Sequence, residues 1–474
     1  MRRTIKKIIS KLLITSLFFG FLILTEGVSQ ENNRIPSKLS LKDCIEMALS
    51  RNYKRRVAQS DIDIAASQYE QAWSGHYPQL ELNANMIRFD DDLNFGQPGF
   101  EYTPEIPGLT LPAIQVPAQK FKVMDKLNFQ SSLDLVIPLY LGGKVSALIR
   151  QANSGIDAAR HEARKTDNEI IYDTKRIYYG AVLGEQMTKI CNDALARLEA
   201  TLEMTENLYQ NGSGKVMKTD YLKNKIIVET TRSLASSMEY EAKTAKAALL
   251  HTIGINRDEE IELTDKDIPF IPWDSEFKTM LSGLLTQSPD LAKLNAGLKA
   301  AEALVDVASS EYYPKIGVMG SVSRIENSYN EGLVTPENKT LMFIGLGLRL
   351  PIFSGFLTQN QVSEAKARQE KLSNQKVLFE RGLTMQLEQA YNQLQGAKER
   401  VKSSGEALKT ANENRVLTER AYQDDILEVK DLIESQIYES IMEALYNKAL
   451  YDHYDLQVQI DFIIGAYSEE WQKK

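Results

Sequence analysis

The chain has 474 residues, 43% of them hydrophobic, which is enough for a large core or for an elongated structure of many elements. Its formal net charge of −8 argues against nucleic acid as a partner, and its two cysteines, Cys44 and Cys191, are too few for a disulfide scaffold. After residues 1–29, no stretch approaches the roughly 20 consecutive apolar residues of a membrane helix. If the chain crosses a membrane, it must therefore do so as a barrel.

Residues 1–29 have the pattern of an export signal. A basic segment precedes an apolar run over 12–24, and Gly27 and Ser29 are small residues suited to cleavage before Gln30. The alternative is an N-terminal membrane anchor, but the apolar run is short for a span. No cysteine lies near the boundary, so a lipid-modified N-terminus is not expected. We therefore predict a protein that leaves the cytoplasm.

The first half begins with two helical patterns and a strand hairpin. Residues 41–52 and 53–73 predict helices, and alternating apolar and polar residues over 79–88 predict the first strand. Residues 95–120 hold five prolines and three glycines, so we expect a long exposed loop there. The second strand, over 129–137, returns from that loop.

A strand-to-helix junction follows the second strand of each half. Proline ends a strand because it cannot donate to the ladder, and glycine lets the chain turn into a helix. One face of each strand is apolar and the other is polar or glycine, which suits a wall with lipid outside and water inside. The junction residues are Pro138, Gly142 and Gly143 in the first half, and Pro351 and Gly355 in the second.

Long helical patterns follow the junctions. The first runs from Lys144 to about Tyr209, and at 1.5 Å per residue it is about 100 Å long, too long for a globular core to enclose. After a turn at 211–214, a second helix runs over about 219–253 and ends at Gly254. Small residues at core positions permit close, coiled-coil packing, and around an axis such helices form a tube. These small residues are Ala152, Ala159, Ala163, Ala181, Ala390 and Ala397.

The two halves of the chain repeat each other. Pro78 matches Pro314 at a shift of 236 residues, and the shift falls to 213 beyond the first strand hairpin because that hairpin has the longer loop. Shifts that stay constant over such long stretches of the two halves indicate an internal duplication. The predicted parts are a first repeat over 30–258 with a strand hairpin at 79–138 and a helical hairpin at 144–254, a linker at 259–274, and a second repeat over 275–474 with corresponding hairpins at 315–351 and 355–465.

Four strands per chain cannot close a transmembrane barrel, since the smallest such barrels have about eight. Open sheet edges are not tolerated in lipid, so the chain must share its barrel with copies of itself. Two copies give eight strands and a filled pore, whereas three give twelve and a hollow one. Small or polar inward residues such as Ser132, Ser321 and Gly345 favour the hollow barrel. The alternative, a soluble sandwich with one wet face, leaves the long helices unexplained.

Three kinds of motif recur in order along the chain: Ala48-Leu49-Ser50-Arg51-Asn52, the junctions at 138–143 and 351–355, and the turn with Tyr209, Gly212, Thr219 and Asp220. By these motifs, and over essentially all of its length after the signal, the chain resembles the TolC family of outer-membrane efflux proteins. In the second turn Asp425 stands where the family has glycine, and Leu427 stands where its best-known member has a basic residue.

The resemblance implies a mainly α fold with membrane β. It implies a homotrimer with a shared twelve-stranded barrel in the outer membrane of a Gram-negative bacterium and a twelve-helix tunnel in the periplasm. The implied function is a passive export duct of a tripartite efflux or type I secretion system. Its implied partners are a periplasmic adaptor protein and, through the adaptor, an inner-membrane pump. The alternative is a soluble periplasmic coiled-coil structural or adaptor protein.

Three acidic residues are candidates for the periplasmic aperture: Asp220, Asp431 and Glu434. Asp431 and Glu434 are three residues apart just beyond the second helical turn, so they share one helix face. The resemblance places them in an acidic ring, where threefold symmetry collects carboxylates and favours cations. The alternative is an acidic helix start that the helix dipole stabilises.

The turns between the long helices are the predicted tip of the tunnel. Their residues are candidates for linking helices there and, by the resemblance, for docking an adaptor; the alternative is ordinary turn and core residues. We expect Val216 and Ile426 to be exposed. The candidates are Tyr209, Gly212, Ser213, Gly214, Val216, Thr219, Tyr422, Asp425 and Ile426.

An enzyme has little support in this sequence. The histidines have no metal-ligand spacing, and no glycine-rich phosphate loop or nucleophile elbow occurs. We therefore expect no catalytic residue, metal or cofactor. The histidines, which we expect to be structural, are His76, His161, His251 and His453.

Overall fold

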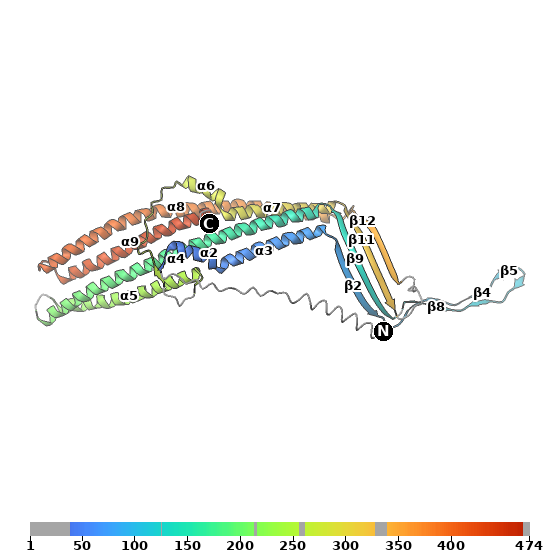
Figure 1. The fold of residues 1–474 in the computed structure, drawn as a ribbon, viewed down its shortest axis with the longest axis horizontal. Helices are drawn as coiled ribbons and strands as arrows, with labels where there is room; N and C mark the ends of the chain where they lie inside the picture. Colours follow the sequence, from blue (N-terminus) through green and yellow to red (C-terminus); the bar gives the residue numbers. More distant parts are fainter. Residues whose placement is uncertain (1–37, 125, 213–215, 256–260, 328–338, 468–474) are drawn as a thin grey trace.

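The computed structural model describes residues 38–124, 126–212, 216–255, 261–327 and 339–467. The predicted export signal and the predicted tip residues Ser213 and Gly214 lie outside the described residues. The molecule is elongated, with long helices at one end, a sheet toward the other, and a two-stranded ribbon beyond the sheet (Figure 1).

The main helices occur in matching pairs. Each half has a helix of 11 residues, one of 21, one of 67, and one of 35 or 36. These matching lengths are what the predicted duplication requires. Over the described ranges, none of these helices combines the length and apolar character needed to span a membrane. The helices are α2 (Leu41–Arg51), α3 (Tyr53–Trp73), α4 (Lys144–Gln210), α5 (Lys218–Thr252), α6 (Phe277–Gln287), α7 (Pro289–Ser309), α8 (Leu357–Gln423) and α9 (Val429–Ile464), with short 3-10 turns η1 (Ser74–His76) and η2 (Ser310–Tyr312).

Local sequence explains where several helices start and stop. The Ser40 hydroxyl accepts a hydrogen bond from the Asp43 N–H at 3.2 Å, and the Asp43 carboxylate accepts one from the Ser40 N–H at 3.0 Å, so the pair caps α2. Helix α7 starts at Pro289, where a missing N–H costs nothing, after the N-cap Ser288. Helix α9 stops at Gly465, whose φ of +86° favours glycine.

Four long strands form one antiparallel sheet in the order β12-β11-β9-β2. Each half of the chain supplies two of them, as predicted, and the central pair β9–β11 joins the halves. Within the described residues, β2 and β12 each have a neighbouring strand on one side only. The strands are β2 (Gln79–Arg88), β9 (Leu127–Leu141), β11 (Lys315–Asn327) and β12 (Thr340–Arg349).

The prediction that Pro138 ends its strand is wrong, because β9 continues through it to Leu141. Pairing with β2 stops at Val136, and the register with β11 skips a residue between Pro138 and Tyr140. Proline is tolerated at such an edge and bulge because its nitrogen need not donate to a ladder there. Pro351 does lie beyond the end of β12, as predicted.

The predicted loop over 95–120 is also wrong, because this segment is a two-stranded ribbon. Three short ladders, β3–β8, β4–β7 and β5–β6, extend the β2–β9 hairpin away from the sheet (Figure 1). The five prolines lie between the ladders or in the end turn, where Pro107 precedes Gly108 with φ +90°. That order is typical of a type II turn. The strands are β3 (Leu93–Gln97), β4 (Phe100–Tyr102), β5 (Glu105–Ile106), β6 (Leu109–Thr110), β7 (Ile114–Val116) and β8 (Gln119–Met124).

The long helices α4 and α8 run along the length of the molecule, and shorter helices stack end to end beside them, α3 with α5 and α7 with α9 (Figure 1). Helices α3 and α5 both pack on α4, while α7 and α9 both lie between α4 and α8. A Cβ added to Gly465 would meet Pro289 Cδ at 2.7 Å, so the end of α9 abuts the start of α7. One chain therefore supplies four parallel rows of helix, as the predicted tube wall requires.

The largest core lies where α2 packs on α4; residues of α5 and α9 complete it, and it includes Cys44. Strand β1 (Lys38–Leu39) pairs in parallel with β10 (Glu262–Leu263), and Ile268 is buried in the same core. The predicted linker over 259–274 is therefore partly anchored to this core. Both cysteines are free, and burial raises the pKa of the Cys44 thiol to about 12.

Candidate pore wall and tunnel tip

One face of the four-stranded sheet is apolar from strand to strand. Register partners in an antiparallel pair lie on the same face, so the pairing defines rows of side chains across the sheet. In these rows Leu82 is 72% exposed and Ile344 is 80% exposed. A continuous exposed apolar surface of this kind marks contact with lipid or another apolar surface. Two neighbouring rows are Leu82, Leu133, Val322 and Met342, and Leu80, Leu135, Gly320 and Ile344.

The opposite face of the sheet is polar at its centre. The Asp134 carboxylate accepts hydrogen bonds from Asn83 Nδ2 at 3.0 Å, Ser132 Oγ at 2.7 Å and Ser321 Oγ at 2.6 Å. These groups come from β2, β9 and β11, so one carboxylate ties three strands together. Glu81, the register partner of Asp134, shares this face. Sequence reasoning missed this cluster because it depends on cross-strand register.

Aromatic side chains gather where strands give way to helices. The rings of Phe353 and Phe356 pack edge to face, with centroids 5.5 Å apart. A girdle of aromatic residues beside an apolar band is typical of a lipid–water boundary. The exposed aromatic residues at this level are Trp73, Tyr77, Tyr140, Tyr312, Tyr313, Phe353 and Phe356.

The glycines predicted for the strand-to-helix junctions have positive φ. Gly142 and Gly143 have φ of +66° and +82° directly before α4, and Gly355 has +62° shortly before α8. A Cβ on Gly142 would overlap the Ser310 carbonyl oxygen, so only glycine fits there. Phe356 occupies the place of Gly143 in the second half with φ +66°, an outlier for a bulky residue that sequence reasoning did not find.

The two tip turns have the same backbone geometry. Gly212 has φ +64° and Asp425 has φ +60°. The N–H of Gly212 donates to the Tyr209 carbonyl at 3.2 Å, and that of Asp425 donates to the Tyr422 carbonyl at 3.1 Å. Asp425 thus adopts the conformation that glycine adopts in the first turn, and aspartate is among the few other residues that visit it.

Asp220 and Asp431 occupy equivalent places in the first turns of α5 and α9. The Asp220 carboxylate accepts a hydrogen bond from the Met217 N–H at 3.1 Å, and the Asp431 carboxylate accepts one from the Glu428 N–H at 3.2 Å. Both acids therefore cap their own helices. This is the alternative role that the sequence left open, and it is compatible with a place at the aperture.

Glu434 lies one turn further along α9 than Asp431 and is exposed. Its carboxylate accepts a hydrogen bond from the Tyr438 hydroxyl at 2.7 Å, which raises the pKa of that hydroxyl. The structure thus brings Asp431 and Glu434 together near the tip, and Asp220 lies on the other hairpin of the same chain.

The exposure expected for Val216 is wrong. Its side chain is 8% exposed, whereas Ile426 is 72% exposed and the neighbouring Met217 is 69% exposed. Burial stabilises an apolar side chain, so Val216 packs within the turn. Gly212 and Thr219 are exposed, as a docking surface requires.

The two tip tyrosines make contacts within the chain. The Tyr209 ring is parallel to that of Tyr221, with centroids 6.1 Å apart, and so joins α4 to α5. Tyr422 packs against a small core that includes Leu198 of α4 and Ile433 of α9. Both tyrosines therefore hold helices of one chain together at the tip.

Residues 44–254 and 280–465 match the family model described as "Outer membrane efflux protein". The chain belongs to this outer membrane efflux protein family. Membership confirms the resemblance to the TolC family of outer-membrane efflux proteins.

Named relatives of this efflux-family chain include two proteins of Pseudomonas aeruginosa. The alkaline protease secretion protein AprF is 21% identical over 320 residues, covering 65% of this chain and 63% of AprF. The pyoverdine export outer membrane protein OpmQ is 22% identical over 245 residues, covering 52% and 50%. The chain thus spans less than two thirds of the length of these relatives.

The fold of this efflux-family chain is similar to that of the Campylobacter jejuni CmeC outer membrane channel. The two structures superpose with a TM-score of 0.72 at 15% identity, over 91% of this chain and 88% of CmeC. This confirms the mainly helical fold with a smaller set of strands.

A buried ion-pair network that sequence reasoning missed joins three helices of the efflux-family chain. Glu439 of α9 lies 3.3 Å from Arg197 Nη2 of α4 and 2.9 Å from Arg415 Nε of α8. Its side chain is 11% exposed. The three residues are far apart in sequence, so no local motif reveals them.

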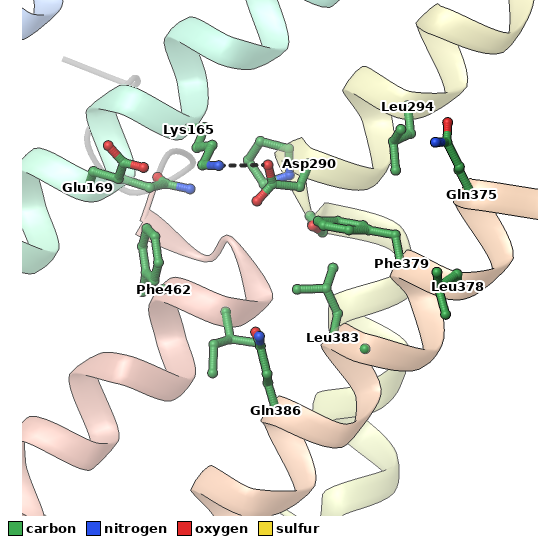
Figure 2. Close-up of a pocket in the computed structure, with 15 residues that line it drawn as sticks. Lys165, Glu169, Asp290, Leu294, Gln375, Leu378, Phe379, Leu383, Gln386 and Phe462 are labelled. Atoms are coloured by element: carbon green, nitrogen blue, oxygen red, sulfur yellow. Dashed lines mark ion pairs between the residues drawn. The ribbon is translucent and has the colours of Figure 1, made fainter. Parts of the chain in front are cut away.

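The helical wall also holds a cavity of about 760 Å³ where α9 meets α7. Lys165 and Asp290 form an ion pair of 3.0 Å at this site, and Phe379, Leu383 and Phe462 line it (Figure 2). None of the predicted site residues lines this cavity. Among the residues that the structure describes, no cluster of His, Cys, Asp or Glu is arranged to hold a metal.

Proposed function

We propose that three copies of this outer membrane efflux protein form a passive export duct across the outer membrane. The four-stranded sheets combine into one twelve-stranded barrel, and the long helices continue it as a tunnel into the periplasm. The observation that carries the proposal is the sheet. It has one apolar face, an opposite face that is polar where β2, β9 and β11 meet, and, in the described chain, a single neighbour for each of β2 and β12.

The open sides of β2 and β12 decide how copies join. Backbone groups without partners cost several kcal/mol each in lipid, so β12 of one copy pairs with β2 of the next. Two copies would make an eight-stranded barrel that side chains fill, and three make a hollow one. Gly345 of β12 lies on the face opposite the apolar rows, and nothing lies within 4 Å of the place a Cβ would take, so it leaves room for a lumen.

The helices support the tunnel. At 67 residues, α4 and α8 are each about 100 Å long. Each chain supplies four rows of helix, so three copies supply the twelve rows of the implied tunnel. The exposed aromatic residues at the strand-to-helix junctions then lie at the periplasmic boundary of the membrane.

At the far end of the tunnel, the tips meet a periplasmic adaptor that links the duct to an inner-membrane pump. Gly212, Thr219 and Ile426 are exposed there and suit docking, and Asp431 and Glu434 line the aperture. AprF and OpmQ are named for the export of a protease and of pyoverdine, two unlike cargoes. The fold therefore carries different cargoes, and the pump and adaptor select among them.

A soluble periplasmic coiled-coil protein fits the structure less well. Such a protein would expose the apolar rows of the sheet and the junction aromatics to water, at a cost of about 25 cal/mol per Å². A membrane removes that cost.

Two residues of β9 test the proposal. Leu133 lies on the apolar face, and Gln130 lies on the opposite face outside the Asp134 cluster. Arginine facing lipid at the bilayer midplane costs about 2–4 kcal/mol, so Leu133→Arg lowers the amount of trimer in the outer-membrane fraction. Gln130→Arg assembles normally and lowers single-channel conductance in planar bilayers. Equal assembly of both variants, or failure of Gln130→Arg alone, contradicts the assigned faces.

A further inference from the structure

The ribbon beyond the sheet presents an apolar face in its middle ladder. Phe100 pairs with Val116 and Tyr102 pairs with Ile114, so these four side chains share one face. Phe100, Tyr102 and Ile114 are 52%, 57% and 54% exposed. Glu101 lies on the opposite face. The ribbon is therefore amphipathic, and its apolar side faces solvent in a single copy.

The same pattern recurs in the end ladder. Ile106 pairs with Leu109, and both are more than half exposed, while Glu105 lies on the opposite face. Near the base, Phe95 is also exposed. An isolated two-stranded hairpin is at best marginally stable in water. A ribbon of this length with exposed apolar side chains therefore needs a partner surface.

The ribbon has a fixed base on the sheet. The Phe89 N–H donates to the Lys126 carbonyl at 2.7 Å, and the Lys126 N–H donates to the Asp92 carboxylate at 2.9 Å. Lys122 Nζ lies 2.7 Å from Asp92 in a half-buried ion pair. The ribbon thus continues the β2–β9 hairpin, whose strand β2 has the open side toward the next copy in the proposed trimer.

The ribbons of one trimer can reach one another. At about 3.3 Å per residue, the arm from Leu93 to Pro107 is about 50 Å long. Strands about 4.8 Å apart and tilted by about 40° make a twelve-stranded barrel about 25 Å across. Each ribbon therefore exceeds the width of the mouth. Attachment to the same mouth also gives the ribbons a millimolar effective concentration for one another.

We propose that the three ribbons of one trimer pack their apolar faces against one another beyond the external mouth of the pore. The partner of each ribbon is a second copy of this chain. The inference rests on the proposed trimeric duct. Packing shields Phe100, Tyr102 and Ile114 from water, leaves Glu101 and Glu105 in solvent, and builds a collar at the exit.

Single cysteines on the two faces test the collar. Phe100→Cys, Tyr102→Cys and the matched control Glu101→Cys are made in the full chain with Cys191→Ser, while the buried Cys44 is kept. Each purified trimer is treated in mild detergent with a short bismaleimide and run on a denaturing gel. We expect several-fold more covalently joined copies from Phe100→Cys and Tyr102→Cys than from Glu101→Cys.

The outcomes separate the collar from the duct. A trimer in which the apolar-face variants cross-link no more than Glu101→Cys overturns the collar and leaves the duct intact. Protection of Tyr102→Cys from a monofunctional maleimide without cross-linking assigns the face to lipid or another protein, and also overturns the collar. A chain that is not trimeric overturns both. As a control, a chain in which a short turn replaces residues 93–124 should still form a trimer, because in the proposed duct the sheet and the helices hold the copies together.

Discussion

Arg415 Nε of α8 lies 2.9 Å from the Glu439 carboxylate of α9, and Arg197 of α4 approaches the same oxygen at 3.3 Å. The contact joins the second helical hairpin to the first between the core and the tip. Removing the Glu439 carboxylate takes one ion pair from each arginine where water has little access, although Arg415 keeps the Glu419 carboxylate 3.0 Å from its Nη1. The stability of the tip half of the bundle therefore depends on Glu439.

Glu439→Gln is expected to lower the free energy of local opening by about 2 kcal/mol, because Arg197 and Arg415 then meet a neutral amide while Arg415 keeps its ion pair with Glu419. Amide hydrogen exchange in α9 near residue 439 should become faster. Glu406→Gln, on the exposed surface of α8, is the matched control and should leave exchange unchanged. Equal exchange in both variants would show that the network does not hold the hairpins together.

Glu443, one turn beyond Glu439, makes the same region sensitive to pH. Burial raises the pKa of its carboxyl above 4.5, and the Glu439 carboxylate adds to the rise. The folded chain then keeps a proton on Glu443 that the unfolded chain releases. The contribution of Glu443 to stability is therefore greatest below pH 4.5 and falls as pH rises through the raised pKa. Glu443→Gln should flatten the dependence of amide protection factors on pH in this window, where the protection factor compares exchange in the folded chain with exchange in the unfolded chain. A profile as steep as that of the unmodified chain contradicts the assignment.

The charge and the capping role of Asp431 can be separated. Asp431→Asn keeps an acceptor for the Glu428 N–H, whereas Asp431→Ala loses it and should destabilise the start of α9 by about 1 kcal/mol. If the carboxylates line the aperture, Asp431→Asn with Glu434→Gln reduces cation preference in bilayer recordings, without the destabilisation. Unchanged selectivity in that double variant would limit Asp431 to capping.

The positive φ of Asp425 predicts a stabilising substitution. Asp425→Gly should stabilise the second tip turn by about 0.5–1 kcal/mol, because glycine adopts this conformation without strain. The reciprocal change, Gly212→Asp, should weaken the first turn by a similar amount. Hydrogen exchange of the two turns measures both effects. Loss of protection in Asp425→Gly would mean that the aspartate side chain makes a contact worth more than the strain.

Much of the fold follows from local pattern. The bounds predicted for the first strand, 79–88, match β2, and the predicted long helix ends one residue short of α4. Periods of 2 and 3.6 residues are local properties of a chain, so they need no knowledge of neighbours. The repeated turns could be paired for the same reason, since Gly212 and Asp425 lie at matching places in the two halves.

The errors arose where neighbours decide the outcome. Pro138 stays in β9 because no strand pairs with it on one side, and the ribbon forms because its prolines lie between ladders. Burial of Val216 depends on how the turn packs. The Asp134 cluster needs cross-strand register, and the Glu439 network needs three helices side by side. None of these relationships is encoded in residue spacing.

The number of copies in the assembled protein tests the account most directly. Native mass spectrometry of the full chain, extracted from outer membranes in mild detergent, should give a mass of three chains, and the same sample should form conducting pores in planar bilayers. A water-soluble monomer whose four strands close upon themselves, with no conductance, would contradict it.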